Sequence, residues 1–379
     1  MTLDDFFKRI NEQYESKLPF VVYRKPNEIK IVSLLQKSDD VFAVQDFNEQ
    51  GFVFAPFDKS REKTILIPIT HSETIFVDSE ELVGGGICLN RTVLSSGSGS
   101  NETDKQEHIE LVQSSINEIK NKQFKKVVLS RKEKVILQEN SPIALLKKLL
   151  DLYKEAFVYC WYHPKIGLWL GATPETLIKI DGKKFSVMSL AGTQGYKGDE
   201  SVTWGVKEKN EQSYVTDYII SSLDGFSDSV KVSGTQTVKA GNLLHLRTQV
   251  SGTLSRGVNG LKDLLYRLHP TPAVCGLPKE TSKQYILKSE NYNREFYSGF
   301  LGELNMETQI APRTGKRNIE NRAYTVNRKH TQLYVNLRCM QIKANEALVY
   351  VGGGITESSI PEKEWEETVL KSLVIKSIL

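Results

Sequence analysis

Apolar residues recur along the chain in two patterns, one helical and one strand-like. Spacings of three and four residues, typical of one buried helical face, predict helices. Runs rich in Val, Ile, Phe and Tyr between turn residues predict strands. The predicted helices cover about residues 2–17, 108–122, 142–156, 206–224 and 361–378. The predicted strands cover residues 20–25, 30–35, 51–57, 63–69, 125–137, 157–163, 167–175, 184–194, 231–240, 245–254, 324–344 and 347–356.

The order of these elements predicts the fold class. Strand clusters interspersed with a few long helices are typical of α+β proteins. Strict alternation of strand and helix is missing, which argues against a doubly wound nucleotide-binding fold. The stretch SSGSGSNETDK at 95–105 is the most linker-like part of the chain and predicts a flexible surface loop.

Length and composition limit the number of domains and the class of protein. A chain of 379 residues fits two ordinary domains or one large one. Hydrophobic residues at 39% and charged residues at 25% indicate a globular protein rather than a disordered chain. The net charge of +4 is too weak, over this length, to favour a nucleic-acid partner.

The four cysteines and the hydropathy profile indicate a compartment. Cys88, Cys160, Cys275 and Cys339 form no CxxC pair, so a zinc ribbon or a redox motif is not expected, and a reducing compartment fits. The first residues lack the apolar segment and cleavage site of a signal peptide, and no apolar run of about 18 residues occurs. We therefore expect a cytoplasmic protein without a membrane partner.

The C-terminal segment carries the first candidate chemistry. Glu364, Glu367 and Lys371 fall within an arc of roughly 60° on the predicted helix, because each residue turns it by about 100°. One interpretation is a solvated acidic helix start, which the helix dipole favours. The other is a hard-cation site, since carboxylates hold Mg²⁺. A separate apolar side is formed by Trp365, Val369 and Leu373.

Three further residues carry chemistry only in the right surroundings. Lys126 on its strand is either a charged guard of a sheet edge or, if buried, a lysine whose lowered pKa suits a general base. Glu175, at a Thr-Pro turn, is either a helix-start acid or a general acid in an apolar pocket. Glu211, taken alone, is an ordinary surface glutamate.

Two loops complete the candidates. LHPTPAVCGLP at 268–278 predicts a rigid loop, either a plain turn or the wall of a pocket, with His269 and Cys275 in structural roles. The run GGG at 352–354 ends a strand without opening a helix and lacks the spacing of a phosphate loop.

The joint order of short motifs is more specific than any one of them. It resembles the chorismate-utilising enzymes, the group of anthranilate, aminodeoxychorismate, salicylate and isochorismate synthases. The likeness covers about residues 105–379. The motifs are KVVLSR (126–131), GATPETL (171–177), SLAGT (189–193), NEQ (210–212), HPTPAVCG (269–276), YSGFLG (297–302), NLRC (336–339), GGGI (352–355) and EWEET (364–368).

The resemblance implies a fold, a division of the chain and roles. It implies one large α+β unit, layered α/β/β/α with mostly antiparallel sheets. In it a variable N-terminal part (1–104) packs on a catalytic domain (105–379), and the protein is a monomer. It implies Lys126 as general base, Glu175 as general acid, and Mg²⁺ held by Glu211, Glu364 and Glu367. The implied contacts of the substrate chorismate are Thr193, His245, Ala273, Tyr297, Arg338, Gly352, Gly353 and Lys371.

Two positions indicate which reaction the resemblance implies. Within the family that the chain resembles, relatives that use ammonia or eliminate pyruvate generally have Thr or Ser at the position of Ala273. Lys126 suits the activation of water. Together they resemble isochorismate synthases, whose product feeds menaquinone or siderophore biosynthesis. A salicylate synthase, which also eliminates pyruvate, is the alternative enzyme. A catalytically idle binding paralogue is the alternative outside catalysis.

Overall fold

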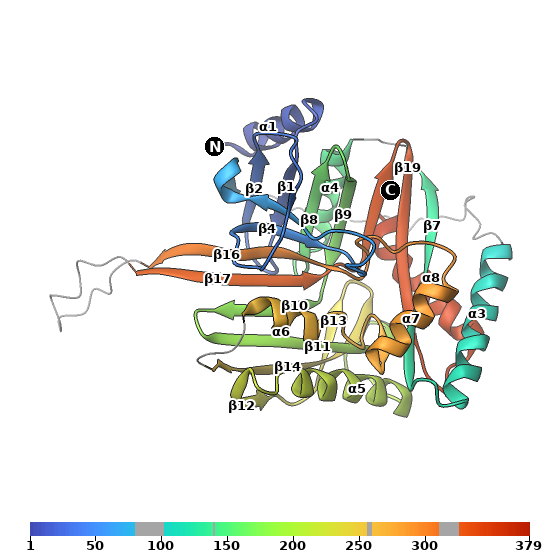
Figure 1. The fold of residues 1–379 in the computed structure, drawn as a ribbon. Coiled ribbons are helices and arrows are strands. Elements are labelled where there is room, and N and C mark those ends of the chain that lie inside the picture. Colours follow the sequence, from blue (N-terminus) through green and yellow to red (C-terminus); the bar gives the residue numbers. More distant parts are fainter. Residues whose placement is uncertain (80–101, 139–140, 256–259, 311–325) are drawn as a thin grey trace.

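The computed structural model describes residues 1–79, 102–138, 141–255, 260–310 and 326–379. Within them the strands form two large sheets in which every pairing is antiparallel (Figure 1). In order across it, the nine-stranded sheet contains β15 (Gly276–Leu277), β7 (Lys126–Ile136), β19 (Glu346–Ile355), β18 (Cys339–Lys343), β9 (Gly167–Thr173), β8 (Phe157–His163), β1 (Phe20–Arg24), β2 (Lys30–Gln36) and β6 (Ser72–Asp78). The ten-stranded sheet contains β12 (Ser227–Val232), β14 (Leu243–Leu254), β11 (Lys184–Gly195), β10 (Thr176–Asp181), β17 (Val326–Val335), β16 (Phe300–Ile310), β4 (Gly51–Ala55), β5 (Ile65–Pro68) and β3 (Phe42–Ala43), with β13 (Gln236–Ala240) paired to β14.

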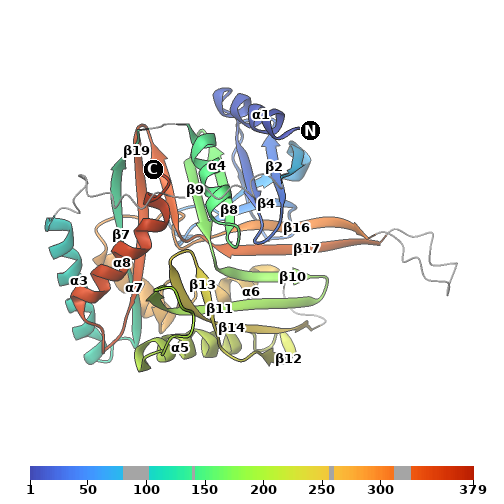
Figure 2. The same cartoon turned by 180° about the vertical axis from the view of Figure 1, so that it is seen from behind.

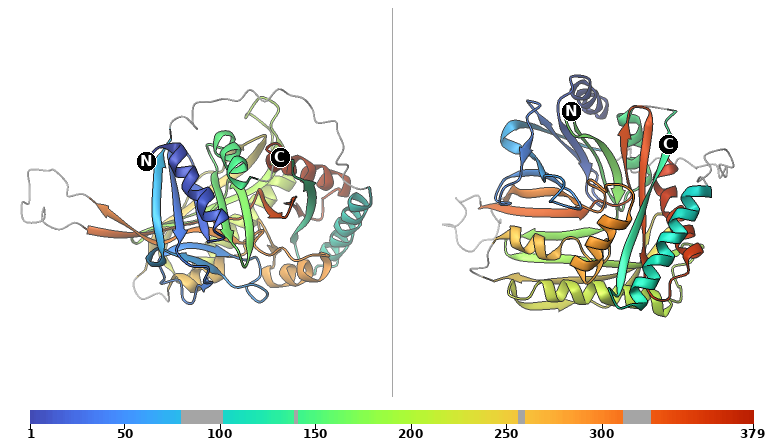
Figure 3. Two further views of the ribbon diagram at one scale, coloured as in Figure 1. Left: turned by 90° about the horizontal axis from the view of Figure 1, so that it is seen from above. Right: turned by 45° about the vertical axis from the view of Figure 1, so that its right-hand side comes forward.

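Helices cover the outer faces of both sheets (Figure 2). They are α1 (Leu3–Glu15), α3 (Glu102–Lys120), α4 (Pro142–Leu152), α5 (Val206–Ser222), α6 (Leu261–Leu268), α7 (Lys279–Ser289) and α8 (Pro361–Lys376), with a short 3₁₀ turn at Ile69–His71. Helices α1 and α4 pack on the nine-stranded sheet, and α5 and α6 pack below the ten-stranded one. Helices α3 and α8 lie against the β7 and β19 side of the molecule (Figure 3).

Three of the five hydrophobic clusters among the described residues hold these layers together. The outer cores join α1 and α4, through residues such as Phe6 and Leu146, to one sheet, and α5 and α6, through Val215 and Leu265, to the other. The middle core lies between the sheets and is rich in aromatic rings, because both sheets bury a face there. Its largest members are Tyr23, Phe52, Phe54, Tyr159, Trp161, Trp169 and Tyr334. The order helix, sheet, sheet, helix confirms the predicted α+β class and its layering.

The predicted helices are found close to their predicted bounds because their ends carry ordinary signals. Ser141 accepts a hydrogen bond from the backbone N–H of Ala144 at 3.3 Å, and Pro142 begins α4. Pro361 begins α8 in the same way. Helix α3 begins at Glu102, earlier than predicted, so the predicted loop is wrong for residues 102–105. Its remainder, 95–101, lies outside the described residues.

Two predicted strands are each split in the structure. The run 231–240 forms parts of β12 and β13, and the run 324–344 forms β17 and β18, its first two residues lying outside the described part. β17 belongs to one sheet and β18 to the other, so the chain crosses between the layers at residues 336–338. No Gly or Pro marks this crossing in the sequence. The helices α6 and α7 and the strands β3, β6, β10, β15 and β16 were not predicted.

The N-terminal segment contributes strands to both sheets. β1 pairs with β8, in the register Phe20↔Tyr162, and β4 pairs with β16, in the register Phe300↔Ala55. The division into a variable part and a catalytic domain stays a prediction. None of the helices described is long and apolar enough to span a bilayer. Cys160, Cys275 and Cys339 are buried free thiols, and Cys88 lies outside the described residues.

Candidate active site

A pocket opens where the two sheets, α5 and α8 meet. Its walls come from segments far apart in the chain, including β7, β11, β14, β19 and the loop before β15. Most of the predicted site residues line it, namely Lys126, Glu175, Thr193, Glu211, His245, Ala273, Tyr297, Arg338, Gly352, Glu367 and Lys371. Gly353 and Glu364 lie beside it, with the ideal Cβ position of Gly353 3.7 Å from Glu364 Oε2.

Lys126 is buried at the start of β7, with 1% of its surface exposed. β7 lies between β15 and β19 rather than at the sheet edge, so the edge-guard interpretation is wrong. Burial lowers the pKa of Lys126 below its ordinary value, although the carboxylate of Glu211, 3.6 Å from its Nζ, acts in the opposite direction. The lysine therefore has the surroundings of a general base rather than of a surface charge.

Glu175 lies in the turn between β9 and β10, with 2% of its surface exposed. No helix begins there, so the helix-start interpretation is wrong. Burial raises the pKa of Glu175 to about 8, and the charges of Lys126 and Arg338 only partly oppose this. A carboxyl that keeps its proton near neutral pH has a proton to donate.

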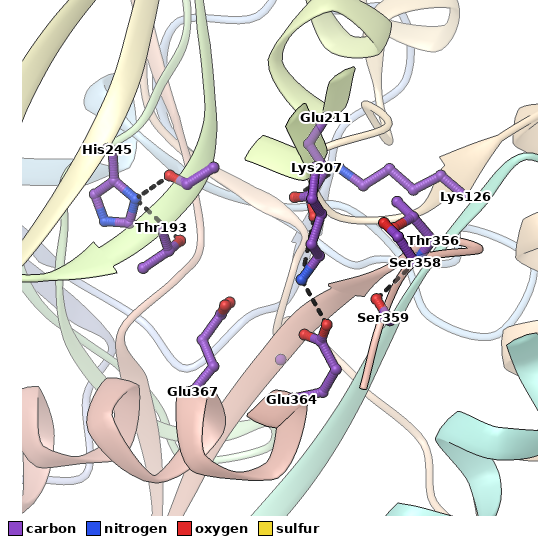
Figure 4. Close-up of polar contacts among 12 residues, drawn as sticks. Lys126, Thr193, Lys207, Glu211, His245, Thr356, Ser358, Ser359, Glu364 and Glu367 are labelled. Atoms are coloured by element: carbon purple, nitrogen blue, oxygen red, sulfur yellow. Dashed lines mark hydrogen bonds and ion pairs between the residues drawn. The ribbon is translucent and has the colours of Figure 1, made fainter. Parts of the chain in front are cut away.

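Three carboxylates converge from two helices (Figure 4). Glu211 projects from α5, and Glu364 and Glu367 project from one face of α8. Only 8% of Glu211 and 2% of Glu364 are exposed, so neither is the solvated glutamate that its helix alone suggested. On the same helix, Trp365 is buried, but Leu373 is 47% exposed, which corrects the predicted apolar side.

Lys207, which the sequence did not single out, lies among these carboxylates. Its Nζ is 2.5 Å from Glu364 Oε1 and 3.6 Å from Glu211 Oε1. Burial opposes its charge, but Glu211 and Glu364 outweigh that effect, so the pKa of Lys207 is raised. The available signal was its position four residues before Glu211, but such pairs are common on solvated helices.

Lys371 secures the neighbouring turn of α8. Its ammonium donates to Glu367 Oε1 at 2.5 Å and to the carbonyl oxygen of Gly352 at 2.9 Å. Burial acts to raise the pKa of Glu367, yet Lys371 and Lys207 outweigh it, and the net effect is a lowered pKa. Glu367 is thus an anion that faces the pocket.

The glycine run of β19 makes room for these charged groups. A Cβ at Gly354 would lie 2.9 Å from Glu211 Oε2 and 3.0 Å from Lys126 Cε. A Cβ at Gly352 would lie 2.9 Å from Tyr297 Oη. As predicted, the run ends a strand and opens no helix. The glycines therefore allow these side chains to approach the backbone of β19 closely.

The opposite wall carries Thr193 and His245. His245 Nδ1 lies 3.1 Å from the carbonyl oxygen of Gly192 and 3.2 Å from Thr193 Oγ1. Because a carbonyl oxygen only accepts, Nδ1 carries the proton, and burial lowers the pKa of the ring to about 3. The buried Nε2 has no hydrogen-bond partner among the described residues and is left as an acceptor.

Arg338 lies in the crossing between β17 and β18, with a left-handed backbone (φ 47°). Its guanidinium lines the pocket and has no ion-pair partner within the described parts of the chain. Tyr297 lies on the same side, and burial raises its pKa to about 12, so it stays a neutral hydroxyl. A fork of N–H donors beside a hydroxyl is suited to a carboxylate ligand.

Ala273 and the loop around it are held by a buried ion pair that the sequence did not reveal. Arg294 donates to the carbonyl oxygens of Val274 at 3.0 Å and Val128 at 2.7 Å, and it pairs with Glu290 at 2.5 Å. Glu290 in turn accepts from the backbone N–H of Ser130 at 2.8 Å. The pair ties the Lys126 strand to the pocket loop.

The donor set fits a hard cation in its chemistry, since carboxylate oxygens are the ligands of Mg²⁺. In the part of the chain that the structure describes, no three His, Cys, Asp or Glu side chains have the spacing of a metal site. In this structure the ammonium of Lys207 lies between Glu211 and Glu364. His269, by contrast, binds the carbonyl oxygen of Ser298 through Nε2 at 2.8 Å and serves the structure.

Comparisons with known proteins show which proteins the chain is similar to. A sequence profile described as "Chorismate binding enzyme" matches residues 89–314, more than half of the chain, and a second one, "chorismate binding enzyme", matches 322–377. Isochorismate synthase MenF of Pasteurella multocida is 27% identical over 297 residues, which are 74% of this chain and 63% of that protein. The match to MenF of Bacillus subtilis, also at 27% identity, covers 71% of this chain and 55% of that protein, so the chain spans little more than half of these relatives.

Solved structures share the fold. The menaquinone-specific isochorismate synthase MenF of Escherichia coli superposes with a TM-score of 0.73 at 20% identity, over 95% of this chain and 88% of that one. Anthranilate synthase component I of Streptococcus pneumoniae superposes with a TM-score of 0.63 at 15% identity, over 94% and 89% of the two chains.

Proposed function

Because the chain belongs to the chorismate-binding enzyme family, we propose that it is an isochorismate synthase, which converts chorismate to isochorismate. The observation that supports this most directly is one pocket that contains a buried lysine with a lowered pKa and a buried glutamic acid with a raised pKa. A base whose pKa is lowered and an acid whose pKa is raised are suited to act together as general base and general acid near neutral pH.

The proposed reaction balances with these two groups. Neutral Lys126 takes a proton from water as the water oxygen bonds to C2 of chorismate. The ring double bond shifts, and the C4–O bond breaks with its electron pair on oxygen. Glu175 gives its proton to that oxygen, which leaves as water. Base and acid of this kind contribute about 10²–10⁴-fold each.

The other residues of the pocket are assigned by their chemistry. Arg338, with Tyr297 beside it, would bind the enolpyruvyl carboxylate through its free N–H groups. His245 Nε2 would accept a hydrogen bond from a substrate hydroxyl, with Thr193 and Gly192 fixing the ring. Lys371 would balance the second negative charge of the substrate.

Mg²⁺ belongs to this proposal as the ion that Glu211, Glu364 and Glu367 would hold. When bound, it would supply a Lewis acid that orients the ring carboxylate of the substrate. Gly353 and Gly354 lie close to these glutamates, and the lack of a side chain there supports this proposal because it leaves room beside them.

Salicylate synthase is the second candidate, since it would form isochorismate and then eliminate pyruvate. Ala273, which lines the pocket without a hydroxyl, favours the proposal without elimination. Relatives named for menaquinone and for vibriobactin synthesis both match the chain, so we propose that isochorismate leaves for one of these two kinds of pathway.

The test is turnover of chorismate by the purified protein with Mg²⁺ and no amine donor. Isochorismate as the product, resolved by chromatography, is the expected result. Release of pyruvate would favour the salicylate alternative. Absence of any turnover, with or without ammonia, would favour the binding paralogue and contradict both enzymes.

A further inference from the structure

Lys207 is the charged group that joins the two helices of the carboxylate cluster. It begins the first turn of α5, four residues before Glu211, and reaches across to Glu364 on α8. Glu367 also contributes to the field that keeps the lysine charged. Two acidic side chains, one from each helix, therefore contact one ammonium (Figure 4), and Glu367 attracts it from a longer distance.

The cluster needs a cation to remain closed. Only 3% of the Glu364 side chain and 10% of the Glu211 side chain are exposed, so water screens their repulsion poorly. Lys371 and Lys126 each pair with one other carboxylate of the cluster, Glu367 and Glu211 respectively, and neither forms an ion pair with Glu364. Lys207 supplies the charge between the helices.

Lys207 is also the most exposed of the three lysines that contact these carboxylates. Its side chain is 21% exposed, against 2% for Lys126 and 12% for Lys371. It follows Val206, which is 76% exposed at the helix start. A rotation of its flexible stem would carry the ammonium into water, where it is well solvated.

We propose that Lys207 is an internal counter-cation of the metal site, which holds Glu211 and Glu364 together before loading and is displaced into solvent when a divalent cation takes its place. This inference rests on the proposed function, because it concerns the ion assigned to that site. Its consequence is that metal binding is an exchange of cations. Lys207 stabilises the site while no metal is bound. The affinity for the metal is lower because binding must displace the lysine.

The exchange predicts opposite effects for two substitutions. Lys207→Gln keeps much of the side-chain length but removes the competing charge, so Mg²⁺ should bind more tightly while the metal-free protein becomes less stable. Lys207→Arg keeps the charge and adds a planar fork that bonds carboxylates in pairs, so it should be harder to displace. Lys209→Gln, an exposed lysine two residues away, is the matched control for a simple change of net charge.

The experiment is titration of each purified, metal-stripped protein with MgCl₂ alone, followed by calorimetry and by the thermal unfolding midpoint. We expect Lys207→Gln to bind at least about tenfold more tightly than the unsubstituted protein and to gain more from saturating MgCl₂ in its midpoint. We expect Lys207→Arg to bind several-fold more weakly and Lys209→Gln to stay within about twofold of the unsubstituted protein.

Three results would overturn the proposal. They are equal or weaker binding by Lys207→Gln, an equal gain in affinity from Lys209→Gln, and absence of Mg²⁺ binding by all four proteins. The titration contains no chorismate, so its outcome is independent of turnover. A protein that converts chorismate but shows no effect at residue 207 would keep the proposed function and lose this inference.

Discussion

At the scale of single residues, the site depends on burial of groups that are usually exposed. Lys126 and Glu175 are 1% and 2% exposed, and their pKa values move in opposite directions for the same reason, which is the cost of a charge in a poorly solvated place. The sequence named both residues, but only the fold decided between a surface and a buried role. The spacing of residues within one element does not show whether segments far away in the chain will bury a side chain.

Glu175 predicts how activity depends on pH. It must carry its proton to act as an acid, and its pKa is raised to about 8, so kcat/KM should fall as the pH rises through about 8. Glu175→Gln should lose about 10²–10⁴-fold in kcat and lose this alkaline limb from its residual activity. A pH–rate profile of both proteins checks this. An alkaline limb that persists in Glu175→Gln would assign it to another group.

Gly354 predicts a steric effect that is specific to the site. A methyl group there would press on Glu211 Oε2 and Lys126 Cε, both at 3.0 Å or less, so Gly354→Ala should lower kcat by about tenfold or more. At Gly353 the nearest atoms lie 3.7 and 3.8 Å away, and Gly353→Ala should lose less. Steady-state kinetics of the two variants side by side give the comparison. Equal losses would mean that the glycine run has another purpose.

At the scale of elements, the sequence pattern, with a proline at the start of α8, predicted the helices that carry the acidic residues but not the breaks in long strands. Helices α5 and α8 begin where the sequence indicates, at Val206 and Pro361. The run 324–344 reads as one strand because it contains neither Gly nor Pro to mark a break. The structure breaks it at residues 336–338, with Arg338 at a positive φ, because the two halves pair with strands from different sheets. Pairing with distant strands is part of the tertiary structure and cannot be predicted from a short stretch of sequence.

The pair Glu290–Arg294 predicts how much one contact between elements contributes to stability. It is buried and joins α7, β7 and the pocket loop, so Arg294→Met should destabilise the protein by about 3–5 kcal/mol, because it leaves a buried carboxylate unpaired. Lys343–Glu295, whose lysine side chain is 54% exposed, should contribute about 0–1 kcal/mol. Chemical denaturation of Arg294→Met and Lys343→Met measures both. Similar small losses in the two variants would contradict the role given to the buried pair.

At the scale of the whole molecule, the N-terminal strands are part of both sheets. β1 and β4 cover the edges of β8 and β16, and Tyr23, Phe52 and Phe54 fill the core between the sheets. A chain that begins at residue 102 would expose two strand edges and an aromatic cavity. No chemical motif marks this segment in the sequence, because its side chains pack in the core between the sheets.

This arrangement predicts the outcome of truncation. The fragment 102–379 contains every predicted site residue, yet we expect it to aggregate or to lack cooperative unfolding. Circular dichroism and size-exclusion chromatography of the fragment, with the full chain as reference, test this. A fragment that unfolds cooperatively and converts chorismate would show that the division at residue 104 separates an independent catalytic domain.

The most direct test of the whole account is the conversion of chorismate by the purified full chain with MgCl₂, compared with Lys126→Ala and with Lys125→Ala, its exposed neighbour. We predict isochorismate without pyruvate from the full chain and from Lys125→Ala. For Lys126→Ala we predict a kcat lower by about 10²–10⁴-fold, with chorismate binding largely retained. Full activity in Lys126→Ala, or no isochorismate from the unsubstituted chain, would contradict the central claim that this buried lysine activates water for addition to chorismate.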